Sequence, residues 1–219
     1  CQAHSSCEIP MDTFRPRYSF EEGSHGVACA STIRDIAPGV ELHLVRANGV
    51  TTLQNAVEWA IRHQIDIVSM SMSFFGNSFY DGGGPINDLA ARLKDGGVLL
   101  VNSAGNYARE HWDGQWYDPD HNGIMDFPWG SSYLPVYYGP GSISVQIQWD
   151  QYTRCGDSDI DATLYDKDGN ILDRSENRQD AEGSNCSPTE HLSGTGSYEG
   201  WYYVQLKLHS GDLPGHIAL

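Results

Sequence analysis

The chain has 219 residues, with 13 Lys and Arg against 29 Asp and Glu and a formal net charge of −16. This balance argues against nucleic acids and anionic membranes as partners, because both bind clustered positive charge. No apolar run approaches the roughly 20 residues of a membrane-spanning helix, so we predict a soluble protein without a membrane span.

The acidic residues are unevenly distributed. Residues 110–199 hold 17 Asp and Glu but only four Lys and Arg, whereas the earlier part is mixed and more apolar. This shift predicts an α/β domain over residues 1–115, an aromatic connector over 116–138 and a β-domain over 139–219. Strong acidity suits an extracellular or cell-surface protein, and the first residues carry no signal-peptide pattern.

The presence of five cysteines does not by itself show whether the protein folds in an oxidising compartment. Cys155 and Cys186 lie in polar, loop-like sequence where a free thiol would be reactive, which favours a disulfide between them. Cys1 and Cys7 form an alternative pair near the start. Cys29 lies among small apolar residues and is predicted to be a buried free thiol.

The first part of the chain alternates helices and strands. After an irregular segment over residues 1–24, small residues predict a closely packed helix over 27–36, which Pro38 ends. Alternating apolar residues predict a strand over 40–45. A capping box at residues 51–54 begins an amphipathic helix that ends near residue 63.

The same alternation continues to residue 101. We predict a buried strand over 65–73, a glycine-rich loop, a helix that begins at Pro85, and a strand over 98–101. This order predicts parallel strands with flanking helices, and such sheets carry their chemistry at the carboxyl ends of the strands.

Beyond residue 110 the apolar residues alternate with period two, and no helical pattern remains. Residues 166–170 have the composition of a hairpin turn. An antiparallel β-sandwich is therefore predicted. Its expected inward positions include Ile143, Val145, Ile147, Ile160, Ala162, Leu164, Tyr202, Val204, Leu206 and Leu208.

Two short stretches could carry acyl-transfer chemistry. His25 lies at the start of the first predicted helix, within Ser-His-Gly-Val-Ala-Cys-Ala. Asn106 follows a predicted strand within Asn-Ser-Ala-Gly-Asn, and a Ser-Met-Ser strand end precedes it in the chain. An imidazole and an exposed amide at strand ends are the residue types of a general base and an oxyanion donor.

In order, these motifs resemble those of the subtilisin-like serine peptidases, over residues 24–108. The family has a His-Gly-Thr helix, an Asn-Met-Ser-Leu-Gly-like strand and Ala-Ala-Gly-Asn. Residues 159–165, 188–190 and 196–198 also resemble the pre-peptidase C-terminal type of sandwich found inserted in some members. The resemblance implies a partial subtilisin-like sheet followed by an inserted β-sandwich.

The resemblance also implies roles for particular residues. His25 would take a proton from a serine hydroxyl and return it to the leaving amine, and Asn106 would donate to the oxyanion. Ser71, Met72 and Ser73 would form an exposed edge that pairs with a protein or peptide substrate.

The chain departs from the family pattern in three places. Val27 stands where threonine is usual, and no Gly-Thr-Ser-x-Ala stretch supplies a nucleophile. Asp12 is the single aspartate upstream of His25 and lacks the apolar strand that the family places before its aspartate. We therefore expect a fragment of a serine endopeptidase that is inactive without the rest of the peptidase chain. A noncatalytic extracellular module that binds protein or glycan is the alternative.

One acidic loop predicts a calcium site. Asp118, Asp120, Asn122 and Asp126 occupy the first, third, fifth and ninth positions of a calcium-loop pattern, with glycine at the sixth. Trp129 stands at the twelfth position, where the full pattern has glutamate. The same residue types also make ordinary turns without a metal.

Overall fold

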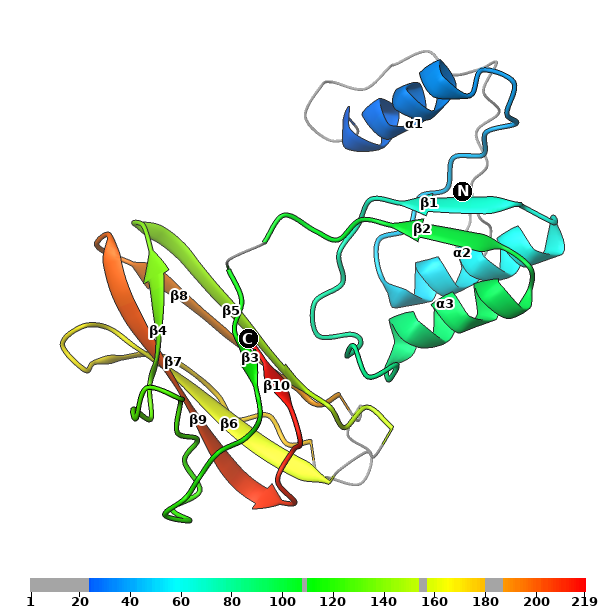
Figure 1. The fold of residues 1–219 in the computed structure, drawn as a ribbon. Helices are drawn as coiled ribbons and strands as arrows, with labels where there is room; N and C mark the ends of the chain where they lie inside the picture. Colours follow the sequence, from blue (N-terminus) through cyan, green and yellow to red (C-terminus); the bar gives the residue numbers. More distant parts are fainter. Residues whose placement is uncertain (1–23, 108–109, 154–156, 180–186) are drawn as a thin grey trace. The chain divides into compact units, whose positions relative to one another are not determined.

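The computed structural model describes residues 24–107, 110–153, 157–179 and 187–219, which form two compact units (Figure 1). The α/β unit contains residues 24–73 and 89–105. The β unit contains residues 74–88 and the described residues from 106 to 219. In the described part of the chain, no helix has the length and apolar character needed to cross a bilayer.

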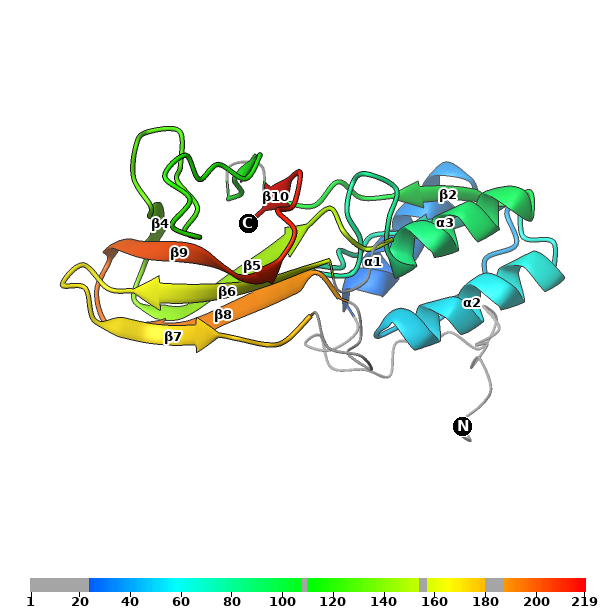
Figure 2. The ribbon, with the colours of Figure 1, turned by 90° about the horizontal axis from the view of Figure 1, so that it is seen from below.

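The α/β unit is built on two parallel strands, β1 (Ile67–Met70) and β2 (Leu99–Asn102), with Ile67 opposite Leu99. Its helices are α1 (Ser24–Ile36), α2 (Val50–Arg62) and α3 (Pro85–Asp95), the last of which it contains from Leu89 onward. Helices α2 and α3 lie side by side on one side of the strand pair, and α1 lies on the other side (Figures 1 and 2). The predicted parallel pairing is confirmed.

The apolar faces of α2 and α3 explain their position. Leu53 and Val57 are buried on α2, and Leu89 and Leu93 are buried on α3, one helical turn apart in each case. Arg92 also forms an ion pair with Glu58 across the two helices, at 2.9 Å between Nη2 and Oε1. Apolar burial dominates this packing, because an exposed ion pair contributes less than about 1 kcal/mol.

Two local predictions are wrong. Residues 41–48 form no strand, because they pair with no neighbouring strand in the described structure. Gly49, with φ of 153°, is the N-cap of α2, and no side chain caps this helix. The Thr52 hydroxyl instead donates to the Gly49 carbonyl oxygen at 2.9 Å, so the predicted capping box does not form.

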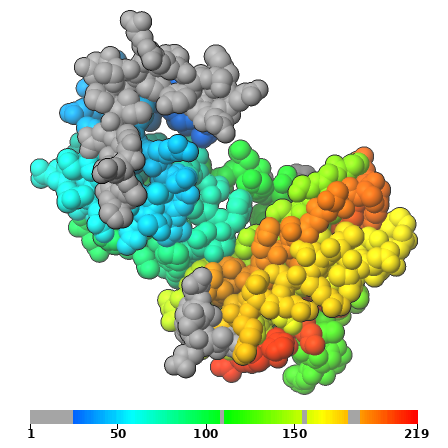
Figure 3. Space-filling view, turned by 180° about the vertical axis from the view of Figure 1, so that it is seen from behind, coloured from blue at the N-terminus to red at the C-terminus, as the bar shows by residue number. Residues whose placement is uncertain are grey.

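The β unit consists of two four-stranded antiparallel sheets. One has the order β3-β10-β5-β8, and the other has the order β4-β9-β6-β7. Their strands are β3 (Asp113–Gly114), β4 (Leu134–Tyr138), β5 (Gly141–Trp149), β6 (Ser158–Tyr165), β7 (Ile171–Ser175), β8 (Thr189–Gly196), β9 (Gly200–Gly211) and β10 (Ile217–Ala218). In the space-filling view, yellow β6 and β7 adjoin orange β8 on the surface of the unit (Figure 3).

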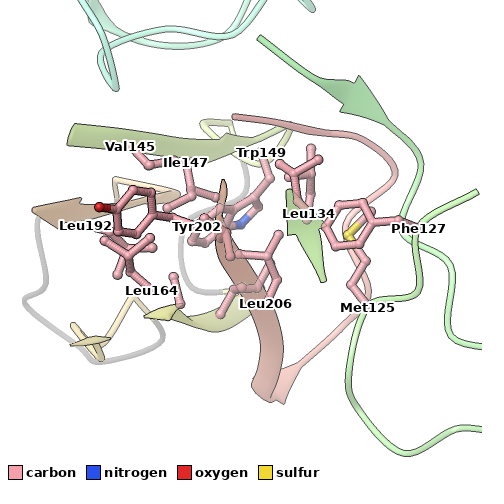
Figure 4. Packing of buried hydrophobic residues seen from close by; sticks show 14 of the residues in the cluster. Met125, Phe127, Leu134, Val145, Ile147, Trp149, Leu164, Leu192, Tyr202 and Leu206 are labelled. Carbon is pink, nitrogen blue, oxygen red and sulfur yellow. The ribbon is translucent and has the colours of Figure 1, made fainter. Parts of the chain in front are cut away.

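Both sheets contribute to one apolar core, as the alternation predicted (Figure 4). Ile147 and Trp149 reach it from β5, and Tyr202 and Leu206 reach it from β9. The intervening residues of these strands are half-buried or exposed. The segment before β4 adds Trp116, Met125 and Phe127 to the same core.

The predicted hairpin turn joins β6 to β7. Asp166 Oδ1 accepts the backbone N–H groups of Asp168 and Asn170 at 2.9 and 2.8 Å. Gly169 has φ of +81°, a conformation that glycine adopts without strain. Local side-chain hydrogen bonds therefore set this turn, which is why composition alone could predict it.

Candidate functional site

The candidate site lies at the carboxyl ends of β1 and β2. Because the strands are parallel, their carboxyl ends lie at the same end of the pair. The Ser103 N–H donates to the Met70 carbonyl oxygen at 3.1 Å, which extends the pairing one residue past β2. Residues 71–73, here called the substrate edge, begin there. The segment that leads to Asn106 begins there too.

His25 lies in the first turn of α1 and contacts the predicted substrate edge. Its Nε2 lies 3.1 Å from the Ser71 carbonyl oxygen, to which it donates when protonated at that nitrogen. The imidazole is exposed, so a reactant could reach it. The structure thus brings together two of the residues that sequence reasoning selected, 46 positions apart in the chain.

Cys29 is a neighbour of His25 that the sequence analysis did not identify. Its Sγ lies 3.8 Å from His25 Nε2, one helical turn along α1. The thiol is free and half-buried, so the prediction of a fully buried thiol is wrong. The spacing of four residues on a helix was the available signal, because such pairs share one face.

Residues 71–73 follow β1 without belonging to it. Ser71 and Ser73 are exposed and Met72 is half-buried. Apart from the Ser71 carbonyl oxygen, which lies against His25 Nε2, their backbone groups make no hydrogen bond to the described residues and are available for pairing with another extended chain.

Asn106 follows Gly105, whose φ of +82° turns the chain after β2. The Asn106 side chain is exposed and makes no hydrogen bond to the described residues. Its amide N–H groups are therefore available to an oxygen atom of a ligand. Asn106 belongs to the β unit, whereas His25 and Ser71 belong to the α/β unit.

The predicted calcium loop brings some of its residues together. Asp118 Oδ2 accepts the Gly123 N–H at 2.9 Å, and Asp120 Oδ2 accepts the Asn122 side-chain amide at 3.0 Å. Asp126 is instead held by the Ser132 hydroxyl at 2.8 Å. Among the described residues, no three His, Cys, Asp or Glu side chains form a group able to hold a metal ion. Calcium binding therefore stays a prediction.

Hydrogen bonding sets the charge state of Asp118. Partial desolvation raises the pKa of its carboxyl, but the N–H groups of Gly123 and Asn122, together with Asp120 and His121, lower the pKa by more, so that it lies below its usual value.

Several predicted residues lie outside the described part of the chain. They are Asp12 and the cysteines of both proposed disulfides, Cys1, Cys7, Cys155 and Cys186.

Comparison with known proteins identifies the family. The model of the subtilase family of peptidases matches residues 12–190. No curated protein matches the sequence. Among solved structures, the CspB protease of Clostridium perfringens is similar, with a TM-score of 0.45 and 12% identity over 79% of this chain. The match covers 40% of the CspB chain. Since the family model spans most of its residues, the chain belongs to the subtilase family.

Proposed function

We propose that this chain supplies the general base, the substrate edge and the oxyanion donor of a serine endopeptidase of subtilisin type. The observation that carries the proposal is the contact between His25 Nε2 and the Ser71 carbonyl oxygen. It places the imidazole beside the backbone that would pair with an extended peptide. Membership of a peptidase family supports the same reaction class and does not favour the noncatalytic alternative.

The reaction is acyl transfer from a peptide bond. His25 takes the proton of a serine hydroxyl as that oxygen attacks the scissile carbonyl carbon, and then gives the proton to the leaving amine. The Asn106 amide donates to the negative oxygen of the tetrahedral intermediate. The Asn106 side-chain amide makes no hydrogen bond to the described residues, which supports this role.

The nucleophilic serine and the orienting aspartate come from another segment in this proposal. The sequence has no Gly-Thr-Ser-x-Ala stretch. The β1–β2 pair also leaves large apolar side chains exposed, with Ile67 and Leu99 both 57% accessible, although parallel sheets are usually covered on both faces. The two antiparallel sheets act as an inserted β-sandwich, and the acidic protein works outside the cell.

An active-site phosphonate probe tests the division of catalytic groups. The purified 219-residue chain should not be labelled, because it lacks the nucleophile. Addition in trans of a subtilase segment that contains Gly-Thr-Ser-x-Ala should give labelling of that serine. Labelling of the 219-residue chain by itself would contradict the proposal.

The role of His25 is tested in the same assay. His25→Ala should abolish labelling of the added segment, because among the described residues no other histidine contacts residues 71–73. His209→Ala is the matched control, since His209 lies on β9 beside Asp161 and far along the chain from the edge. Equal labelling by the two variants would show that His25 is not the base.

A further inference from the structure

The sheet of β4, β9, β6 and β7 carries aromatic side chains on its outer face. Alternate residues of β9 fill the core, so Trp201 and Tyr203 lie on the opposite face of the sheet. Tyr137 of β4 is opposite Trp201 in the register, and Tyr165 of β6 is opposite Tyr203. Four aromatic side chains from three neighbouring strands therefore share one face.

Tyr133, which directly precedes β4, adds a fifth ring. Its centroid lies 5.6 Å from that of Tyr165 and 6.5 Å from that of Tyr203. Tyr133, Tyr137, Tyr165, Trp201 and Tyr203 are here called the outer aromatic face. Tyr137 and Trp201 are 55% and 51% accessible. Contiguous apolar surface of this kind marks an interaction site, whereas single exposed apolar side chains do not.

Glu199 gives one end of the outer aromatic face a negative charge. The Tyr137 hydroxyl donates to Glu199 Oε1 at 3.1 Å. The rings of Tyr137 and Trp201 lie 5.2 Å apart, with their planes at 75°. Glu199 is exposed and forms no ion pair with the described residues. Because the faces of aromatic rings attract cations, two rings at a steep angle beside such a carboxylate are complementary to a positive charge.

The surrounding charge favours the same kind of partner. Residues 110–199 hold 17 Asp and Glu against four Lys and Arg, so the electrostatic field of this region attracts cations. Arginine fits better than lysine, because its planar guanidinium stacks on a ring and donates two parallel N–H groups to a carboxylate. A neutral sugar could stack on the rings but would leave Glu199 without a charged partner.

The spacing along β9 adds a second point of contact. Trp201 and Tyr203 are two residues apart on an extended strand, which separates them by about 7 Å. Alternate side chains of an extended peptide have the same separation and point to the same side. A peptide that lies along β9 with one side chain on Trp201 therefore places the side chain two residues away on Tyr203, beside Tyr133.

We propose that the outer aromatic face binds an extended segment of a basic protein: an arginine of that segment stacks on Trp201 and pairs with Glu199, and an apolar side chain two residues away packs on Tyr203. All of these residues belong to the β unit, so the inference concerns that unit by itself and does not rest on the proposed function. Because charge attraction contributes to it, the binding weakens as salt is added.

NMR titration of the ¹⁵N-labelled 219-residue chain tests the inference. The probe is a capped peptide of sequence Gly-Arg-Ser-Leu-Gly, compared with the same peptide carrying citrulline, which keeps the size of arginine and removes its charge. The arginine peptide should shift the backbone N–H signals of residues 200–204, and citrulline should weaken the affinity about tenfold. Replacement of the leucine of the peptide by alanine should weaken it about threefold.

Two pairs of variants locate the contacts on the chain. Glu199→Gln should weaken binding of the arginine peptide about tenfold and remove its advantage over the citrulline peptide. Glu176→Gln is the matched control, at an exposed carboxylate just after β7, the opposite edge strand of the same sheet. Trp201→Ala should also weaken binding about tenfold. Tyr117→Ala, at a tyrosine of the β unit that is 59% accessible and outside the face, should leave the affinity unchanged.

Three results would overturn the inference. The first is equal affinity for the arginine and citrulline peptides, and the second is an absence of shifts at residues 200–204. The third is a set of shifts there with the neutral sugar cellohexaose but not with the peptide, which would assign the face to a glycan. Should Trp201→Ala unfold the β unit, Glu199→Gln decides the question, because it makes an isosteric change in an exposed side chain.

Discussion

At the scale of single residues, the pair of Tyr80 and Asp113 is the clearest case of a charge held by its neighbours. The hydrogen bond from His216, and then that from Tyr80, lower the pKa of the Asp113 carboxyl. Burial, and then the hydrogen bond to Asp113, raise the pKa of the Tyr80 hydroxyl. Both shifts widen the pH range over which Tyr80 is protonated and Asp113 is ionised.

These shifts predict the acid sensitivity of the loop of residues 74–88, which contains Tyr80. A carboxyl whose pKa is lower in the folded state stabilises that state above its unfolded pKa of about 3.9, and the stabilisation is lost as pH falls through the folded value. NMR signals of the Tyr80 ring, followed from pH 7 to pH 2, should therefore report loosening of the loop below about pH 4.

Asp113→Asn should remove that acid transition, whereas Asp35→Asn, at an exposed carboxyl on α1, should leave it in place. A transition that survives in Asp113→Asn would assign the acid sensitivity to another group.

At the scale of elements, the loop of residues 118–126 is set by its own side chains. Asp118 accepts two backbone N–H groups, in the way that Asp166 does in the hairpin between β6 and β7. The two loops differ in that only the first carries the Asp-x-Asp-x-Asn-Gly spacing of a calcium loop. This difference offers a matched test of the predicted metal.

Calcium should raise the melting temperature of the chain, and a chelator should reverse the effect. Ligand at about 100 times its Kd stabilises the folded state by about 2.7 kcal/mol. Asp120→Ala should abolish the response, while Asp166→Asn should preserve it. A melting temperature that changes neither with calcium nor with the chelator would count against a stabilising site.

At the scale of the whole molecule, apolar burial is concentrated in the β unit. Its core residues are largely inaccessible, Leu206 among them at 0%, whereas the α/β unit exposes Ile67, Leu99 and Val101 on its strands. Because stability follows buried apolar area, the β unit should resist unfolding longer than the α/β unit.

Leu206→Ala should lower the free energy of unfolding of the β unit by about 2–5 kcal/mol, since it leaves a cavity between the two sheets. Leu213→Ala, at an exposed leucine of the same unit, should change it by less than about 0.5 kcal/mol. Urea unfolding followed by tryptophan fluorescence measures both values. Similar losses in the two variants would contradict a core centred on Leu206.

The sequence by itself determined the elements whose residues repeat with a clear period. Helix α2, the parallel pair of β1 and β2, and strands β5, β6 and β9 follow from spacing, because burial of one face imposes that spacing. The three ordered motifs also identified the family, which the match over residues 12–190 confirms. Where residues 40–45 had the pattern of a strand, no neighbouring strand pairs with them in the described structure.

Only the tertiary structure decided which distant groups meet. Tyr80 and Asp113 lie 33 positions apart, and His216 and Asp113 lie 103 positions apart. Periodicity reports which face of an element is buried, but it carries no information about the side chain on the opposing element. The contact of His25 with Ser71, and that of Tyr80 with Asp113, depend on how the chain folds back on itself, and local sequence does not encode that.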